Sequence, residues 1–246
     1  MKVTQYQTTK DFNLRPYVLK PTGGKMGGTE TIIVSEAPVN TDFHGFGVAI
    51  TGSSCYNLAL MDEQKRADFL NDIYGDDGLG LSVARLSVAS SDYSAELYSY
   101  DDVKNDTSLE HFSVERDDDY TVPMIKEALK VRPDMFVFAS PWSPPGWMKQ
   151  NGSELGMYNN VEGTLKTLKY QAYANYITKF IQNYESRGID IYAITPNNEP
   201  DHASYDWPAL PMSHTQAQTL VADYLRPTLT QNGIDAKILC WDHSYT

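Results

Sequence analysis

Apolar strand-like segments and amphipathic helices alternate along most of this chain, and that alternation constrains the fold more than any other feature. The predicted strands are GFGVAI (45–50), LSVARLSV (81–88), MFVFAS (135–140), IYAIT (191–195) and KILCW (237–241). Helices are predicted between them at 62–74, 122–131, 165–184 and 213–231, the last disturbed near Pro227. Strands that are apolar on both faces and separated by helices indicate a parallel sheet covered by helices. We therefore expect an α/β fold.

Two α/β architectures fit this pattern, a doubly wound open sheet and a (β/α)8 barrel. The first strand runs into TGSSC, which lacks the glycine fingerprint of a dinucleotide-binding turn. Polar, aromatic-rich loops follow the C-terminal ends of the strands, as in barrel enzymes. The barrel is favoured, although five βα units cannot close eight strands. We expect residues 41–246 to form an incomplete barrel, the N-terminal part of a longer protein.

Residues 1–40 differ from the rest of the chain. They mix polar residues with a short β-like run at 30–35 and paired glycines at 23–24 and 27–28. This pattern predicts one or two strands of a side element outside the main core.

Charge and composition exclude several functions. With 246 residues the chain has ample length for a core, and its net charge of −12 argues against binding nucleic acid or an anionic membrane surface. No apolar stretch approaches a membrane span, and the first twelve residues have no apolar signal-peptide region, so the compartment stays open. The two cysteines, Cys55 and Cys240, are expected to be free buried thiols near strand ends.

A glutamate followed by proline, Glu199, lies just past the predicted strand 191–195. A carboxylate held by a rigid turn at the end of a barrel strand is where sugar-cleaving barrels keep an acid/base catalyst. A solvated loop glutamate or a helix cap is an equally open interpretation. The preceding Asn198 could donate to a sugar hydroxyl or simply form the turn before Pro200.

Other strand ends supply further candidate site residues, because parallel strand ends meet on one face of a barrel. Arg85 lies in an apolar strand, where its charge needs a carboxylate partner, either structural or catalytic. Trp142, between Pro141 and Pro144, suits a rigid stacking wall or ordinary packing. The remaining candidates are Asp92, Asp242 and His243.

Other chemistries lack their motifs. The sequence contains no HExxH, CxxC, phosphate loop or GxSxG pattern, and its five histidines show no metal-ligand spacing. Asp242 with His243 could form part of a triad, but no serine in a strained elbow completes it. We therefore expect neither a metal nor an organic cofactor.

Five stretches together carry a family resemblance, namely HGFGVAITGSSCYNLAL, ARLSVASSDYS, FASPWSPPGWMKQNG, YAITPNNEP and ILCWDHS. In this order and spacing, from His44 to the end, they resemble glycoside hydrolase family 30, the glucosylceramidase-like retaining β-glycosidases. The resemblance implies a (β/α)8 barrel with a β-sandwich side domain. The N-terminal segment and residues after the barrel would build that side domain.

The resemblance also implies roles for the candidate residues. Glu199 would be the acid/base, and Asn198 would bond the sugar beside the scissile bond. Arg85 would support the charge of the nucleophile, while the remaining positions would line the first sugar subsite (Asp92, Trp142) or its surroundings (Asp242, His243). Family 30 places its nucleophile, a glutamate, after a seventh strand. We expect residues 1–246 alone to be catalytically incomplete.

For substrate, the resemblance favours a carbohydrate or glycolipid with a β-glycosidic bond, either glucosylceramide-like or a β-1,6-glucan. The alternatives are another retaining barrel glycosidase, such as a β-xylosidase or β-1,6-galactanase, and an inactive carbohydrate-binding protein. An extracellular or secreted location is the family expectation.

Overall fold

A computed structural model of the chain describes residues 3–8, 14–19, 37 and 40–244, and these fall into two compact units, Met1–Phe43 and His44–Thr246. In the first unit, β1 (Val3–Thr8) pairs antiparallel with β2 (Leu14–Leu19). Assignment of this unit to a β-sandwich stays a prediction. The β-like run at 30–35 and the paired glycines lie outside the described residues.

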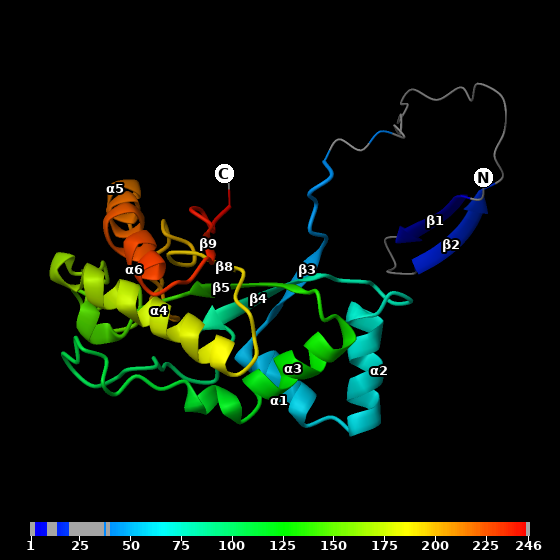
Figure 1. Cartoon of the computed structure of the whole chain (residues 1–246), viewed down its shortest axis with the longest axis horizontal. Coiled ribbons are helices and arrows are strands. Elements are labelled where there is room, and N and C mark those ends of the chain that lie inside the picture. The colour runs from blue at the N-terminus through cyan, green and yellow to red at the C-terminus, as the bar shows by residue number, and fades with distance from the viewer. Residues whose placement is uncertain (1–2, 9–13, 20–36, 38–39, 245–246) are drawn as a thin grey trace. The chain divides into compact units, whose positions relative to one another are not determined.

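The second unit is built on one parallel five-stranded sheet in the order β3-β4-β5-β8-β9 (Figure 1). Its strands are β3 (Gly47–Ile50), β4 (Val83–Val88), β5 (Phe136–Pro141), β8 (Ala193–Ile194) and β9 (Lys237–Ile238). Arg85 lies opposite Phe138, and Ala139 lies opposite Ile194. Each of the five predicted strands is present, so the parallel α/β prediction is confirmed.

Three predicted helices form close to their expected bounds, as α2 (Glu63–Tyr74), α3 (Thr121–Val131) and α4 (Tyr170–Ser186). Asp62 caps α2 by accepting from the backbone N–H groups of Gln64 and Lys65. The sequence analysis missed α1 (Gly52–Ala59), because it assigned TGSSC to a loop. The side-chain Oγ1 of Thr51 caps this helix by accepting a hydrogen bond from the backbone N–H of Ser54. The small residues after β3 therefore begin a helix.

The predicted helix at 213–231 is continuous but irregular. It consists of α5 (His214–Thr219), a π-helical segment η4 (Leu220–Leu225) and α6 (Arg226–Gln231). Pro227 has no N–H to donate and its ring crowds the preceding turn, so a wider turn just before it relieves the clash. The predicted disturbance near Pro227 is confirmed.

Short elements interrupt the loops that follow β4 and β5. They are η1 (Glu115–Asp118), η2 (Gly146–Met148), the strands β6 (Met157–Tyr158) and β7 (Val161–Glu162), and η3 (Thr167–Lys169). β6 and β7 pair antiparallel around Asn159 and Asn160, whose φ angles are 51° and 61°. Positive φ at both central residues defines the tight turn that matches strand twist in hairpins.

The two faces of the sheet have different surroundings. In β4 the side chains of Ala84, Leu86 and Val88 are buried, and the intervening Arg85 is only partly buried. Because side chains alternate along a strand, Arg85 projects from the opposite face. Figure 1 shows α1, α2 and α3 gathered on one side of β3 and β4. The face that carries Arg85 is therefore the one available for a site.

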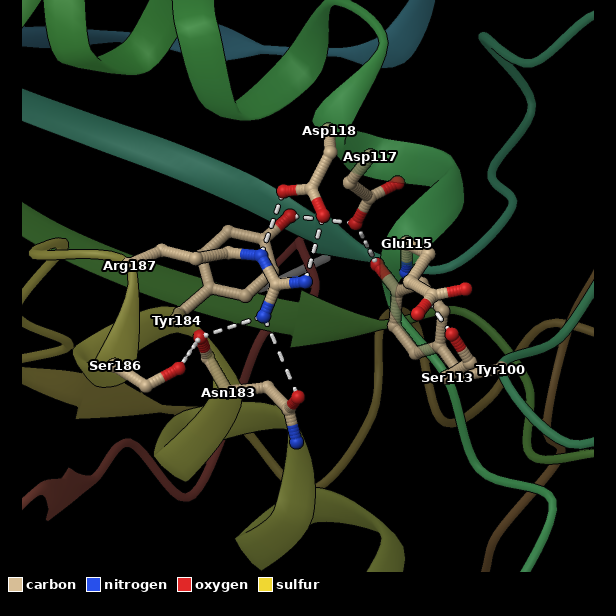
Figure 2. A network of polar contacts seen from close by, with 9 residues as sticks. All are labelled: Tyr100, Ser113, Glu115, Asp117, Asp118, Asn183, Tyr184, Ser186 and Arg187. Carbon is tan, nitrogen blue, oxygen red and sulfur yellow. Dashed lines mark hydrogen bonds and ion pairs between the residues drawn. The ribbon is translucent and has the colours of Figure 1, made fainter.

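A buried polar network fixes the long loop after β4 to α4 (Figure 2). The Asp117 carboxylate accepts from the hydroxyls of Tyr100 (2.6 Å) and Tyr184 (2.7 Å). Next to it, Arg187 donates to both carboxylate oxygens of Asp118, at 2.6 and 2.7 Å. Burial raises the pKa of Asp117, and the two hydroxyl donors oppose that rise. These contacts hold the 97–118 loop in place.

The two cysteines differ in burial. Cys55 lies on α1 and is buried, and this burial raises the pKa of its thiol to about 12. Cys240 is exposed, so the expectation of two buried thiols is wrong for this residue. β9 lies at the end of the described sheet, and the residues after it have neighbours on one side only. Both thiols are free. Among the described helices, none has the length and apolarity to cross a membrane.

Candidate active site

Arg85 joins residues from three strand ends into one cluster. Its Nη2 donates to Oδ1 of Asn198 at 2.7 Å and to Oδ2 of Asp242 at 2.7 Å. The Trp142 ring covers the guanidinium, with Cζ 4.5 Å from the ring centroid. Contacts with an aromatic face and with a carboxylate together hold the guanidinium in one orientation. Four of the predicted site residues therefore share one location.

Two hydroxyl residues that the sequence analysis missed complete this cluster. Ser140 Oγ donates to Oδ2 of Asp242 at 2.6 Å, and Thr195 Oγ1 lies 3.3 Å from the same oxygen. The two hydroxyl oxygens are themselves 2.6 Å apart. In the sequence, the available signal for these two site residues was a small hydroxyl residue at the C-terminal end of an otherwise apolar strand.

The backbone at Glu199 is constrained from both sides. Its N–H donates to the carbonyl of Asp242 at 3.0 Å, and the N–H of Asn198 donates to the carbonyl of Pro141 at 2.7 Å. The φ angle of Glu199 is 45°, in the left-handed region that residues other than glycine rarely adopt. The loop after β8 is thus tied to the loops after β5 and β9, and it holds a half-buried carboxylate in a strained turn.

Two predicted site residues lie outside the Arg85 cluster. Asp92 is exposed, and within the described chain its side chain makes no hydrogen bond or ion pair. The His243 ring contacts Trp241, with centroids 5.9 Å apart, and its Nδ1 lies 3.3 Å from Ser244. The roles of Asp92 and His243 stay predictions. Nε of Arg85 is buried and has no partner in the part of the chain that the structure describes.

A fully buried lysine, Lys149, was also missed by the sequence analysis. Its Nζ donates to the carbonyls of Glu154 (2.6 Å), Leu155 (2.8 Å) and Ala209 (2.6 Å), and lies 3.0 Å from Ser143 Oγ. Burial lowers the pKa of Lys149, and the nearby Glu154 charge opposes this. These hydrogen bonds of Lys149 link the loop after β5 to the loop after β8. In the sequence, the signal for this buried lysine was its position inside an apolar loop rich in proline and tryptophan.

The cluster suits proton transfer to a bound polar ligand. Glu199 is a half-buried carboxyl group on a constrained turn, Asn198 is an amide beside it, and the Trp142 ring packs over the Arg85 guanidinium. Residues 40–244 contain no group of three or more histidine, cysteine, aspartate or glutamate side chains that could hold a metal ion.

Comparison with known proteins decides the family. The model of the glycosyl hydrolase family 30 TIM-barrel domain matches residues 43–245. The chain belongs to this family. The resemblance found in the sequence motifs is therefore confirmed, as is a TIM-barrel-type α/β domain.

Relatives of this family 30 chain are longer than the chain itself. It is 35% identical over 210 residues to putative glucosylceramidase 3 of Caenorhabditis elegans, covering 82% of this chain and 39% of the relative. It is 32% identical over 203 residues to the endo-1,6-β-D-glucanase of Neurospora crassa, covering 81% and 42%. The solved endo-β1,6-glucanase BT3312 is 37% identical, with a TM-score of 0.70 and coverage of 79% and 43%. The chain thus spans about two-fifths of these relatives.

Proposed function

We propose that this chain contributes the acid/base part of a retaining β-glycosidase site. The observation that carries the proposal is Glu199 on a strained turn directly after Asn198, whose amide oxygen is bonded to Arg85. The backbone of this turn is bonded to Pro141 at the end of β5 and to Asp242 after β9, at the C-terminal strand ends where barrel enzymes bind their substrates.

In this proposal Glu199 performs two proton transfers. Its carboxylic acid gives a proton to the glycosidic oxygen as the bond from that oxygen to the sugar breaks. A second carboxylate forms a covalent bond to the sugar and holds it. Glu199, now ionised, then takes a proton from the water that releases the sugar. Retaining chemistry needs the two carboxyls about 5 Å apart. By family resemblance the second follows a seventh strand.

The other candidate residues would bind and orient the sugar. Oδ1 of Asn198 accepts from Arg85, and among the described residues its side-chain N–H₂ has no partner, so we propose that this group meets a sugar hydroxyl. Trp142, which packs over Arg85, is proposed to line the first sugar subsite, and Asp242 keeps Arg85 in place. Asp92 and His243 are proposed to line the same pocket, because both follow strands whose ends lie beside it.

A β-glucosidic bond is the proposed target, and β-1,6-glucan is the favoured substrate. Support comes from the endo-1,6-glucanases among the relatives, one of them 37% identical in its solved structure. Glucosylceramide-like lipids come second, supported by the glucosylceramidase relatives. A β-xylosidase or β-1,6-galactanase activity, or a binding role without catalysis, are the remaining alternatives.

Replacing Glu199 with glutamine tests the acid/base role. The assay belongs on a protein form that carries this chain within a complete barrel, using aryl β-glucosides with good and poor leaving groups. We expect Glu199→Gln to lower turnover of poor leaving groups by roughly 10²–10⁴-fold, and that of good ones far less, because only the former need a proton.

Glu63→Gln, on the exposed start of α2, is the matched control and should leave both rates unchanged. Equal losses for good and poor leaving groups would contradict the assignment of Glu199. Glucan binding without hydrolysis in the unmutated complete barrel would favour the carbohydrate-binding alternative.

A further inference from the structure

A hollow lies between the loop after β4 and the loop after β5. Its volume is about 710 Å³, and its walls include Leu97, Asp102, Asn105, Trp147, Glu154 and Tyr158. Neither Glu199 nor any member of the Arg85 cluster lines it. It is therefore a separate concavity, and nothing in the proposed mechanism uses it.

The aromatic ring of Tyr158, in the β6–β7 hairpin, lines this hollow. Tyr158 is 46% exposed, although it lies in a paired strand, β6. The turn at Asn159 and Asn160 has the twist that hairpins favour, and the N–H of the neighbouring Met157 donates to the carbonyl of Ser204 at 2.7 Å, so the backbone at Tyr158 is held from two sides. An exposed tyrosine with a fixed backbone loses little conformational entropy when a flat ligand stacks on it.

Polar groups of both charge signs also line the hollow. Asp102 and Glu154 supply carboxyl groups, Asn105 an amide, and Lys104 and Lys166 ammonium groups. Ser90 Oγ donates to Glu154 at 3.3 Å. Burial, with the negative charge of Asp102 second, raises the pKa of Glu154 to about 7. This mixture provides donors and acceptors for neutral hydroxyl groups. It does not match a phosphate, which would meet two carboxylates, or an acyl chain.

The hollow lies at the same end of the parallel strands as the candidate active site. Both of its loops follow the C-terminal ends of their strands, β4 and β5. Lys149 ties the backbone of Glu154 and Leu155 to Ala209, in the loop that continues from Glu199. A polymer crossing this end of the strands could therefore occupy both sites.

We propose that this hollow is a distal subsite for a β-linked glucan chain, with Tyr158 stacking on one sugar ring. Asp102, Asn105 and Glu154 exchange hydrogen bonds with the hydroxyls of that ring. This inference rests on the proposed function, and it adds a reason for polymeric substrates to be preferred over single glucosides.

Binding of β-1,6-gluco-oligosaccharides to the 1–246 chain tests the subsite without requiring catalysis. We expect Tyr158→Ala to raise the dissociation constant measured by calorimetry roughly three- to tenfold, which corresponds to the free energy usually contributed by one aromatic contact. Tyr56→Ala is the matched control, since Tyr56 is 48% exposed but lines a different hollow. It should leave binding unchanged. An unchanged affinity in Tyr158→Ala, with folding verified by circular dichroism, would overturn the subsite.

Chemical-shift mapping with the same oligosaccharide separates this inference from the proposed function. Shifts at Asn105, Trp147 and Tyr158 support the distal subsite. Shifts confined to Trp142 and Asn198 overturn it and leave the proposed function standing. In a complete barrel, Tyr158→Ala should raise KM for long glucans while kcat and the hydrolysis of aryl glucosides stay as before.

Discussion

At the residue scale, the ionisation of Glu154 links stability to pH. It is largely enclosed between the Ser90 hydroxyl and the Asp102 carboxylate, and its pKa is raised from 4.5 to about 7. Between these two values the folded chain holds a proton that the unfolded chain has released. The contribution of Glu154 to stability is therefore complete below pH 4.5 and is lost as the pH rises through about 7.

Glu154→Gln should remove this pH dependence. Relative to the unmutated chain, we expect the variant to gain stability as the pH rises from 4.5 to 8, by up to about 3 kcal/mol. Chemical unfolding at a series of pH values measures the difference. Glu63→Gln changes an exposed residue of α2, and its free energy of unfolding should show the same pH dependence as that of the unmutated chain. A constant difference between Glu154→Gln and the unmutated chain across that range would show that Glu154 titrates normally.

At the element scale, the β6–β7 hairpin depends on its two asparagines. Both have positive φ angles, which asparagine and glycine tolerate and β-branched residues do not. The hairpin is only two residue pairs long, Met157 with Glu162 and Tyr158 with Val161, so its turn determines whether it forms.

Substitutions at Asn160 should separate turn geometry from side-chain chemistry. We expect Asn160→Gly to leave the hairpin intact and Asn160→Val to destabilise it by roughly 1–2 kcal/mol, because valine is strained at this φ angle. Amide hydrogen exchange across residues 157–162 measures the effect. Similar protection in both variants would mean that the surrounding loop, and not the turn, holds Tyr158 in place.

At the scale of the whole molecule, the parallel sheet of the second unit is open in the part of the chain that the structure describes. β3 and β9 each pair on one side only, and Val48 and Trp241 are 42% and 39% exposed. A closed barrel would cover both edges. The proposed site also needs a second carboxylate, which the family resemblance places after a seventh strand.

Residues 1–246 alone should therefore show negligible hydrolysis of an activated aryl β-glucoside. Even a good leaving group requires the nucleophile that forms the glycosyl intermediate. A release assay with the purified chain measures this, with a complete family 30 relative as positive control. Turnover close to that of the relative would mean that a carboxylate within this chain acts as nucleophile.

Local sequence patterns predicted much of the fold because they depend on near neighbours. Apolar runs located the five strands, Asp62 indicated the start of α2, and Pro227 indicated an irregular helix. The same reasoning failed at α1 and at the hairpin. The small residues after β3 resemble a loop, and two strands of two residues are too short to show a period, although paired asparagines between apolar residues were a usable signal.

By itself, the sequence determined the alternation of strands and helices, and it showed which polar residues follow each strand. Only the tertiary structure decided which of them meet. Arg85 and Asn198 are 113 residues apart in sequence, and Arg85 and Asp242 are 157 apart, yet one guanidinium bonds to both. It likewise decided that Lys149 would be buried and Cys240 exposed. Such outcomes depend on strand order and register, which place distant residues side by side and which no local pattern encodes.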